Sequence, residues 1–327
     1  MKPSLSRRSC LAAAALALAS TCLPALAQKY PERPVKVIVP FAPGGAIDTM
    51  TRPIAEAMGR ELGQTLVVEN KAGAAGNIGA AQVAKANADG YTLLVGTSAT
   101  HGANPALFAK PGYDAVADFA PIMLFGGVPN ILVVNAEKGS KTLAEITQRA
   151  KAQPDKLTYG SAGTGTSLHL AGILFEQAAG VKLVHVPYKG GAPASVDLMG
   201  GQIDMMFDTV AVSLPNIKAG KLRPIAVAAA ERHFALPEVP TFAELGVKGV
   251  EASTWAGLFA PKGTPAPVVA ELRRAAEKAM KVARVQEVLR NNGFQLMAWP
   301  GERFGGLVDR ETKRWGKVVR DAGIQAQ

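Results

Sequence analysis

The sequence predicts an α/β protein of two lobes, each built around a mainly parallel β-sheet flanked by helices. Short β-branched segments such as 35–39 (VKVIV) alternate with segments of helical length, which is typical of strands buried between helices. Glycine-rich turns follow several of these strands. Two apolar runs, 119–134 and 254–260, break the alternation because no helix accompanies them. They predict two strands that cross between the lobes and act as a hinge.

The first series of units contains three strands and the two helices that connect them. Pro53 is expected near the start of the first helix, where proline is tolerated best. Asp89-Gly90 is a turn signal before the third strand. A glycine-rich loop at 73–79 precedes the second helix. In chain order, the strands and helices are expected at 35–39, 47–62, 65–69, 80–86 and 91–95.

The second series lies between the two crossings and repeats the same alternation. Two long amphipathic helices, 268–290 and 304–322, follow the return crossing, with apolar residues at helical spacing. One lobe is therefore interrupted by the other. The predicted domains are 28–126 together with 248–327, and 127–247. The strands of the inserted lobe are expected at 157–159, 184–186, 203–207 and 223–229, and its helices at 143–152, 167–179, 192–200 and 214–219.

The N-terminus has the pattern of an export signal over residues 1–27. Lys2, Arg7 and Arg8 precede an apolar run at 10–23, and Ala25-Leu26-Ala27 offers a cleavage site after Ala27. The run is shorter than the ~20 residues of a membrane span. The arginine pair leaves both the general secretory and the twin-arginine routes open. A lipoprotein anchor at Cys22 is disfavoured by the preceding threonine.

Composition excludes several classes of function. The chain has 327 residues, and its two cysteines, Cys10 and Cys22, both lie in the export signal. The remainder can therefore form neither a disulfide nor a cysteine nucleophile nor a thiolate metal site. The formal net charge is +10. The basic residues are scattered and form no stripe with interleaved aromatic residues, so no nucleic-acid partner is expected.

Motifs for cofactors and catalysis are absent from the sequence. No G-x-G-x-x-G opens the first unit, and neither a P-loop nor a G-x-S-x-G elbow occurs. The four histidines have no i,i+4 partner of the kind that binds zinc. We therefore expect no cofactor, no metal and no enzymatic activity.

Two glycine-rich turns occupy matching places in the two series, at 39–50 (VPFAPGGAIDTM) and 159–170 (YGSAGTGTSLHL). Each leads from a strand into a helix, whose first N–H groups have no intrahelical partner and carry partial positive charge. Glycine lets an anion approach these amides, at the carboxyl ends of the strands where α/β proteins bind ligands. Either turn alone is also explained as a simple chain reversal. Their occurrence in both lobes favours an anion site between them.

Four side chains near these turns leave alternatives open. Asp48 either caps its own loop or contacts a ligand. Asp208, at the end of a strand, either lines the cleft or supports the hinge. His101 either packs in its loop or contacts the ligand. His169 either supports its helix or contacts the ligand.

Four segments closely resemble the Bug family, the extracytoplasmic solute receptors of tripartite tricarboxylate transporter type: 30–52, 67–97, 157–175 and 185–207. The resemblance implies a monomeric two-lobed periplasmic binding protein, a type II-like Venus flytrap. It would close around a small carboxylate: a dicarboxylate, a tricarboxylate, an acidic amino acid or an aromatic acid. Its partners would be the membrane subunits of a transporter. A sensor that acts on a membrane kinase, or an exported hydrolase, is the alternative. The one departure in a loop is Ala74-Ala75, where the family pattern leads us to expect another glycine.

The resemblance also implies which residues hold the ligand carboxylate, through loop amides and hydroxyls. They lie on the first-lobe turn, on the loop after the third strand, and on the second lobe. Carried over by position they are Phe41, Pro43, Gly44, Gly45, Asp48, Thr97, Ser98, His101, Asn104, Ser161, Gly163, Thr164, Gly165, Thr166, His169, Lys189 and Asp208.

Overall fold

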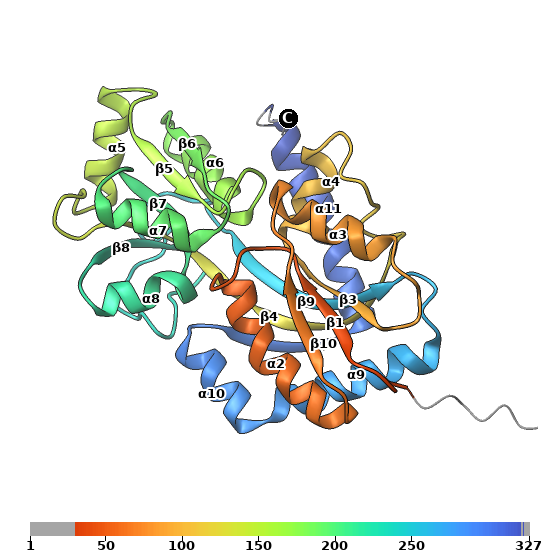
Figure 1. The fold of residues 1–327 in the computed structure, drawn as a ribbon. Helices are drawn as coiled ribbons and strands as arrows, with labels where there is room; N and C mark the ends of the chain where they lie inside the picture. The colour runs from red at the N-terminus through yellow and green to blue at the C-terminus, as the bar shows by residue number, and fades with distance from the viewer. Residues whose placement is uncertain (1–29, 322, 324–327) are drawn as a thin grey trace, which may run out of the picture.

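Two lobes joined by crossing strands make up the computed structural model, which describes residues 30–321 and residue 323 (Figure 1). The predicted export signal and its cleavage after Ala27 lie outside these residues. Within them, no helix combines the length and the apolar character that a membrane crossing requires.

The first lobe is organised around β1 (Val35–Val39), which pairs in parallel with β2 (Leu66–Asn70) on one side and β3 (Thr92–Thr97) on the other. β3 pairs antiparallel with the return strand β9 (Ser253–Pro261). The sheet of this lobe is therefore parallel at one edge and antiparallel where the chain returns. Its other elements are α2 (Ala46–Leu62), η1 (Ala74–Gly76), α3 (Asn77–Ala84), η2 (Ala99–Ala103), α4 (Asn104–Leu107), α9 (Ala266–Lys281), α10 (Ala283–Asn291), β10 (Gln295–Pro300) and α11 (Gly301–Asp321).

The second lobe repeats this plan with β5 (Thr158–Ser161) at the centre of a parallel trio. β5 lies between β6 (Val184–Pro187) and β7 (Met205–Thr209). Helices pack on this sheet, and β8 completes it through β4. These elements are α5 (Leu143–Ala152), α6 (Ser167–Ala179), α7 (Gly191–Gly200), α8 (Val210–Lys218) and β8 (Leu222–Ala228).

A single long strand, β4 (Phe119–Asn135), connects the lobes. Its first part, as far as Pro129, pairs with β9, and from Asn130 onward it pairs with β7 and β8. The expected fold of two α/β lobes joined by crossing strands is thus confirmed. The domain limits at 126/127 and 247/248 stay a prediction, and the first of them falls inside β4.

Several local expectations are corrected. The helix expected at 268–290 is two helices, α9 and α10, separated at Val282, whose backbone is extended (φ −65°, ψ 119°). Leu272 of α9 and Leu289 of α10 are both fully buried. Pro53 lies inside α2 rather than in its first turn. Ala74 and Ala75 both have positive φ (45° and 52°), where the glycine expected from the family would be unstrained.

The two lobes are in contact beyond the hinge. Leu107 of α4 and Trp315 of α11 belong to the same buried apolar cluster as Leu168 and Leu170 of α6. The first two residues come from the first lobe and the last two from the second. The structure therefore has the lobes packed together around the region between the two predicted turns.

Candidate functional site

The first-lobe turn is held by one buried carboxylate. The N–H of Gly44, which has a φ of +78°, donates to Asp48 Oδ2 at 3.0 Å. Arg52 donates to both oxygens of Asp48 at 2.9 and 2.8 Å, and Asn70 Nδ2 donates at 3.0 Å. Burial alone would raise the pKa of Asp48, but these hydrogen bonds outweigh it and hold the pKa below its ordinary value. Asp48 thus supports the turn from behind.

The second-lobe turn is held by neutral imidazoles. The N–H of Gly165 donates to His169 Nδ1 at 3.1 Å, so this nitrogen carries no proton. The ring of His169 stacks on His185 with centroids 4.0 Å apart, and His185 Nε2 shares a 2.6 Å hydrogen bond with Ser161 Oγ. Burial lowers the pKa of His169 to about 4, and burial with the neighbouring His169 lowers that of His185 to about 3. Both rings are therefore uncharged at neutral pH.

These contacts use the amides of the turn glycines internally. The N–H groups of Gly44 and Gly165 donate to the side chains just described, and that of Gly163 donates to Ser161 Oγ at 3.1 Å. The N–H groups that remain without intrahelical partners are those of the first helical residues. In α2 these include Ala46 and Ile47, after a Gly45 that provides no side-chain cap. The available donors thus lie one step further along the chain than the sequence suggested.

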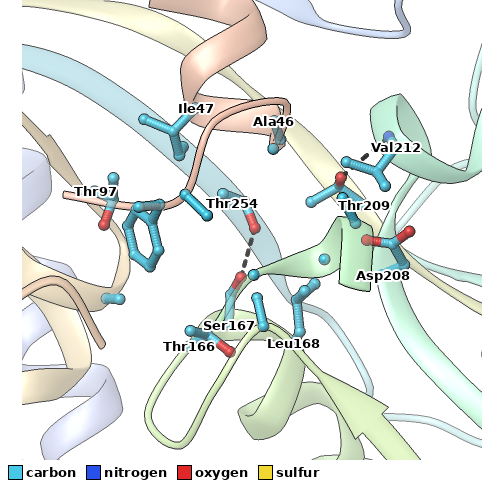
Figure 2. Close-up of a pocket in the computed structure, with 18 of the residues that line it drawn as sticks. Ala46, Ile47, Thr97, Thr166, Ser167, Leu168, Asp208, Thr209, Val212 and Thr254 are labelled. Atoms are coloured by element: carbon cyan, nitrogen blue, oxygen red, sulfur yellow. Dashed lines mark hydrogen bonds between the residues drawn. The ribbon is translucent and has the colours of Figure 1, made fainter. Parts of the chain in front are cut away.

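These first helical residues line a small cavity between the lobes, of about 50 Å³ (Figure 2). The amino ends of α2, α6 and α7 and the end of β7 all reach it. Thr254 of β9 and Ser167 of α6 share a 2.6 Å hydrogen bond there, which joins hinge and second lobe. The lining residues are Phe41, Ala42, Pro43, Gly45, Ala46, Ile47, Thr97, Ser98, Ala99, Ala162, Thr166, Ser167, Leu168, Gly190, Gly191, Ala192, Pro193, Asp208, Thr209, Val212 and Thr254.

The electrostatics of the cavity depend on helix ends and one carboxyl group. Among these lining residues there is no lysine, arginine or histidine, and Asp208 is the one ionisable side chain. Asp208 is fully buried, and Ser213 Oγ donates to its Oδ2 at 2.7 Å. Burial raises the pKa of Asp208 to about 7, although the hydrogen bond from Ser213 opposes the rise. Backbone dipoles therefore provide the positive potential in this cavity.

The structure distributes the predicted site residues over four places. Those in the cavity lining are Phe41, Pro43, Gly45, Thr97, Ser98, Thr166 and Asp208. A neighbouring hollow of about 590 Å³ is lined by Phe41 again and by Gly163, Thr164 and Lys189. The networks that support the two turns contain Gly44, Asp48, Ser161, Gly165 and His169.

The two remaining residues are buried outside the cavity lining, His101 in the first lobe and Asn104 at the start of α4, where it faces Gly165 of the second lobe. His101 is fully buried and stacks on Phe259 with centroids 4.0 Å apart, and burial lowers its pKa to about 3. Asn104 is also fully buried and donates to Asn77 Oδ1 at 2.6 Å. Neither is among the cavity-lining residues. Ligand contact at any of the predicted residues stays a prediction.

The amino end of α7 is the main part of the cavity that the sequence reading did not single out. Gly190, Gly191, Ala192 and Pro193 all line it. The segment repeats the combination of two glycines and a proline between strand and helix that marked residues 43–45. That similarity was the available signal.

A two-lobed α/β molecule with helix ends facing one cavity between the lobes defines the class of solute-binding proteins. Residues 50–324 match the family model TctC, the tripartite tricarboxylate transporter family receptor. The chain belongs to this family.

Relatives match over nearly their whole length. A UPF0065 protein from the tcbD-tcbE intergenic region of a Pseudomonas species is 40% identical over 96% of this chain and 94% of its own. Protein BugT of Bordetella pertussis is 36% identical over 95% of each chain.

Solved structures agree with the fold. The periplasmic binding protein BugD superposes with a TM-score of 0.87 at 38% identity, covering 91% of this chain and 100% of its own. R. palustris Rpa4515 with adipate superposes with a TM-score of 0.87 at 36% identity, covering 90% of this chain and 99% of its own. MatC (Rpa3494) from Rhodopseudomonas palustris with bound malate superposes with a TM-score of 0.85 at 37% identity, covering 89% of this chain and 100% of its own. The chain therefore has the fold of the TctC and Bug-type periplasmic binding proteins.

Proposed function

We propose that this protein, after export and cleavage behind Ala27, binds a small carboxylate between its lobes in the periplasm. It then presents the acid to the membrane subunits of a tripartite tricarboxylate-type transporter. Binding is reversible and without turnover. Lobe closure is the signal to the membrane partner, because a ligand that contacts both lobes favours their closed arrangement.

The observation that carries the proposal is the meeting of helix amino ends from both lobes at one cavity. Ala46 and Ile47 begin α2 in the first lobe, and Ser167 and Leu168 begin α6 in the second. Their N–H groups are hydrogen-bond donors in the positive part of a helix dipole. A carboxylate has two oxygens and is of the size and charge that such donors accommodate. The cavity thus favours an anionic group without requiring an arginine.

Two of the similar structures carry acids, adipate in one case and malate in the other. They support carboxylic acids as the ligand class for this chain. They leave the individual acid open, because the lining residues away from the helix ends decide it.

A thermal-shift screen of the mature protein against carboxylic acids tests the proposal. An acid present at a hundredfold its Kd stabilises the folded protein by ~2.7 kcal/mol. The matched controls are the methyl esters and primary amides of the same acids, which keep the body and lose the anionic group. We expect shifts with acids only. Absence of a shift with every acid, or equal shifts with the esters, would contradict the proposal.

Turnover is checked in the same samples. Each binding acid is incubated with the protein and recovered, and we expect it back unchanged. Formation of a product would favour the hydrolase alternative instead.

A further inference from the structure

Asp208 has one oxygen to which none of the described residues donates. Its Oδ2 accepts from Ser213, but Oδ1 has no hydrogen-bond partner among the described residues, although the side chain is fully buried. Buried carboxylate oxygens without a partner are rare and costly. Because Asp208 lines the cavity between the lobes, a molecule in that cavity is placed to provide the missing donor.

The space beside this oxygen is kept open by a glycine. A Cβ on Gly191 would lie 2.9 Å from Asp208 Oδ1, too close for unchanged packing. The φ of Gly191 is outside the left-handed range, so its backbone would also accept alanine. Glycine is thus not required by the chain path at this position. Its effect is the free volume next to Oδ1.

The two kinds of group in the cavity select different parts of one ligand. The helix ends favour a negative group, whereas Asp208 accepts hydrogen bonds and repels negative charge. In Figure 2, Asp208 lies beside Thr209 and Val212, and Thr97 lies on the opposite side of the view. Apolar side chains, among them Ile47 and Leu168, also line the cavity.

We infer that Asp208 determines specificity by accepting a hydrogen bond from a donor group at the end of the ligand opposite its carboxylate. The solute is then a short acid with an amino or hydroxyl group at that end. An ammonium group is held most tightly, because it pairs with the ionised form of Asp208. This inference rests on the proposed function, since it takes the carboxylate at the helix ends as given.

The probes are four acids of one chain length that differ only at the far end: γ-aminobutyrate, γ-hydroxybutyrate, butyrate and succinate. The corresponding set one methylene longer is measured in parallel. Affinities by titration calorimetry are compared for the wild type, Asp208→Asn and Gly191→Ala. Asp204→Asn is the matched control, because Asp204 precedes the same strand, accepts from Thr158 and is not a cavity-lining residue.

We expect the wild type to bind the amino acid most tightly, the hydroxy acid next, and butyrate and succinate least. Asp208→Asn weakens binding of the amino acid by about tenfold or more, because a site built to accept a hydrogen bond from its ligand depends strongly on that bond. The same variant improves succinate, since the new amide donates to its second carboxylate. Gly191→Ala weakens the amino acid and hydroxy acid, and Asp204→Asn leaves the order unchanged.

Two results would overturn the inference while leaving the proposed function intact. One is succinate or butyrate binding at least as tightly as the amino acid to the wild type. The other is an unchanged order of affinities in a folded Asp208→Asn protein. Binding of none of these acids, combined with failure of the wider acid screen, would instead overturn the proposed function and this inference with it.

Discussion

The two turns at the cavity have one geometry and two different chemistries. In each, a glycine with positive φ donates its N–H to a side chain four residues later: Gly44 to Asp48, and Gly165 to His169. The first acceptor is an ionised carboxylate paired with the half-exposed Arg52. The second is a buried, neutral imidazole stacked on His185. The fold therefore needs an acceptor at this position, and the two lobes meet that need in ways that respond differently to pH and mutation.

Acidification is expected to have the largest effect, and of the two turns it acts on the second. An unfolded histidine binds a proton near pH 6.5, whereas His169 stays neutral until about pH 4. The unfolded state thus binds more protons in this window, and the free energy of unfolding falls as pH is lowered through it, by on the order of 3 kcal/mol for this group. Asp48, with its lowered pKa, loses its contribution only below about pH 4.

Chemical denaturation of the wild type and His169→Asn at about pH 7 and about pH 4.5 measures this difference. Asparagine retains an acceptor for the Gly165 N–H and does not titrate. The variant should lose less stability on acidification than the wild type. Equal losses in the two proteins would mean that His169 does not carry the pH dependence.

Removal of the Asp48 carboxylate, the acceptor in the first turn, is expected to have the second largest effect. Asp48→Ala leaves the Gly44 N–H, Arg52 and Asn70 without their shared partner. We expect a loss of about 2 kcal/mol of stability, since the carboxylate is buried but Arg52 is half exposed. Urea unfolding measures it. Asp48→Asn is the control, retains one acceptor and should lose about half as much; an Asp48→Ala protein as stable as the wild type would contradict this account.

Alanine at the two glycines should separate backbone strain from lobe contact. Both residues have positive φ, so each substitution strains the backbone by about 1 kcal/mol. A Cβ on Gly44 meets nothing within 4 Å, whereas one on Gly165 collides with Leu107 of the other lobe. Gly165→Ala should therefore also weaken ligand binding by about tenfold, because it opposes closure.

The double variant Gly165→Ala with Leu107→Ala provides the test of this contact. It should recover most of the lost affinity, because the alanine at 107 makes room for the new methyl group. An equal loss of affinity in Gly44→Ala and Gly165→Ala would show that strain alone matters.

The smallest effect is expected from a cap on α2. Gly45 is an extended N-cap (φ −74°) without a side-chain hydrogen bond. Gly45→Ser should stabilise the free protein by a few tenths of a kcal/mol. It should also weaken ligand binding, because the hydroxyl occupies a first-turn N–H that we assign to the carboxylate. Gly45→Ala is the control, because it adds the Cβ without a capping hydroxyl. Calorimetry compares the ligand affinities of the two variants. An equal loss of affinity in both would point to steric hindrance rather than to the cap.

Short-range patterns determined much of this protein. Val35–Val39 forms a buried strand and Ser167–Ala179 a helix as expected, because β-branched runs and glycine or hydroxyl signals act over a few residues. The two crossing strands followed from two apolar runs without helices. The sequence also predicted the positions of both turns and the place of Asp208 at a strand end near the cavity.

Only the tertiary structure decided which donors remain free. The sequence predicts free N–H groups at Gly44 and Gly165. In the structure these N–H groups donate to side chains four residues later. The reason is that packing sets the φ/ψ angles and the side-chain directions. The separation of α9 from α10 at Val282, without glycine or proline, has the same origin. The approach of Gly191 to the unpaired oxygen of Asp208 depends on how the start of α7 packs against β7, the element that follows it. Contacts of this kind depend on how the sheets and helices meet, which no local pattern specifies.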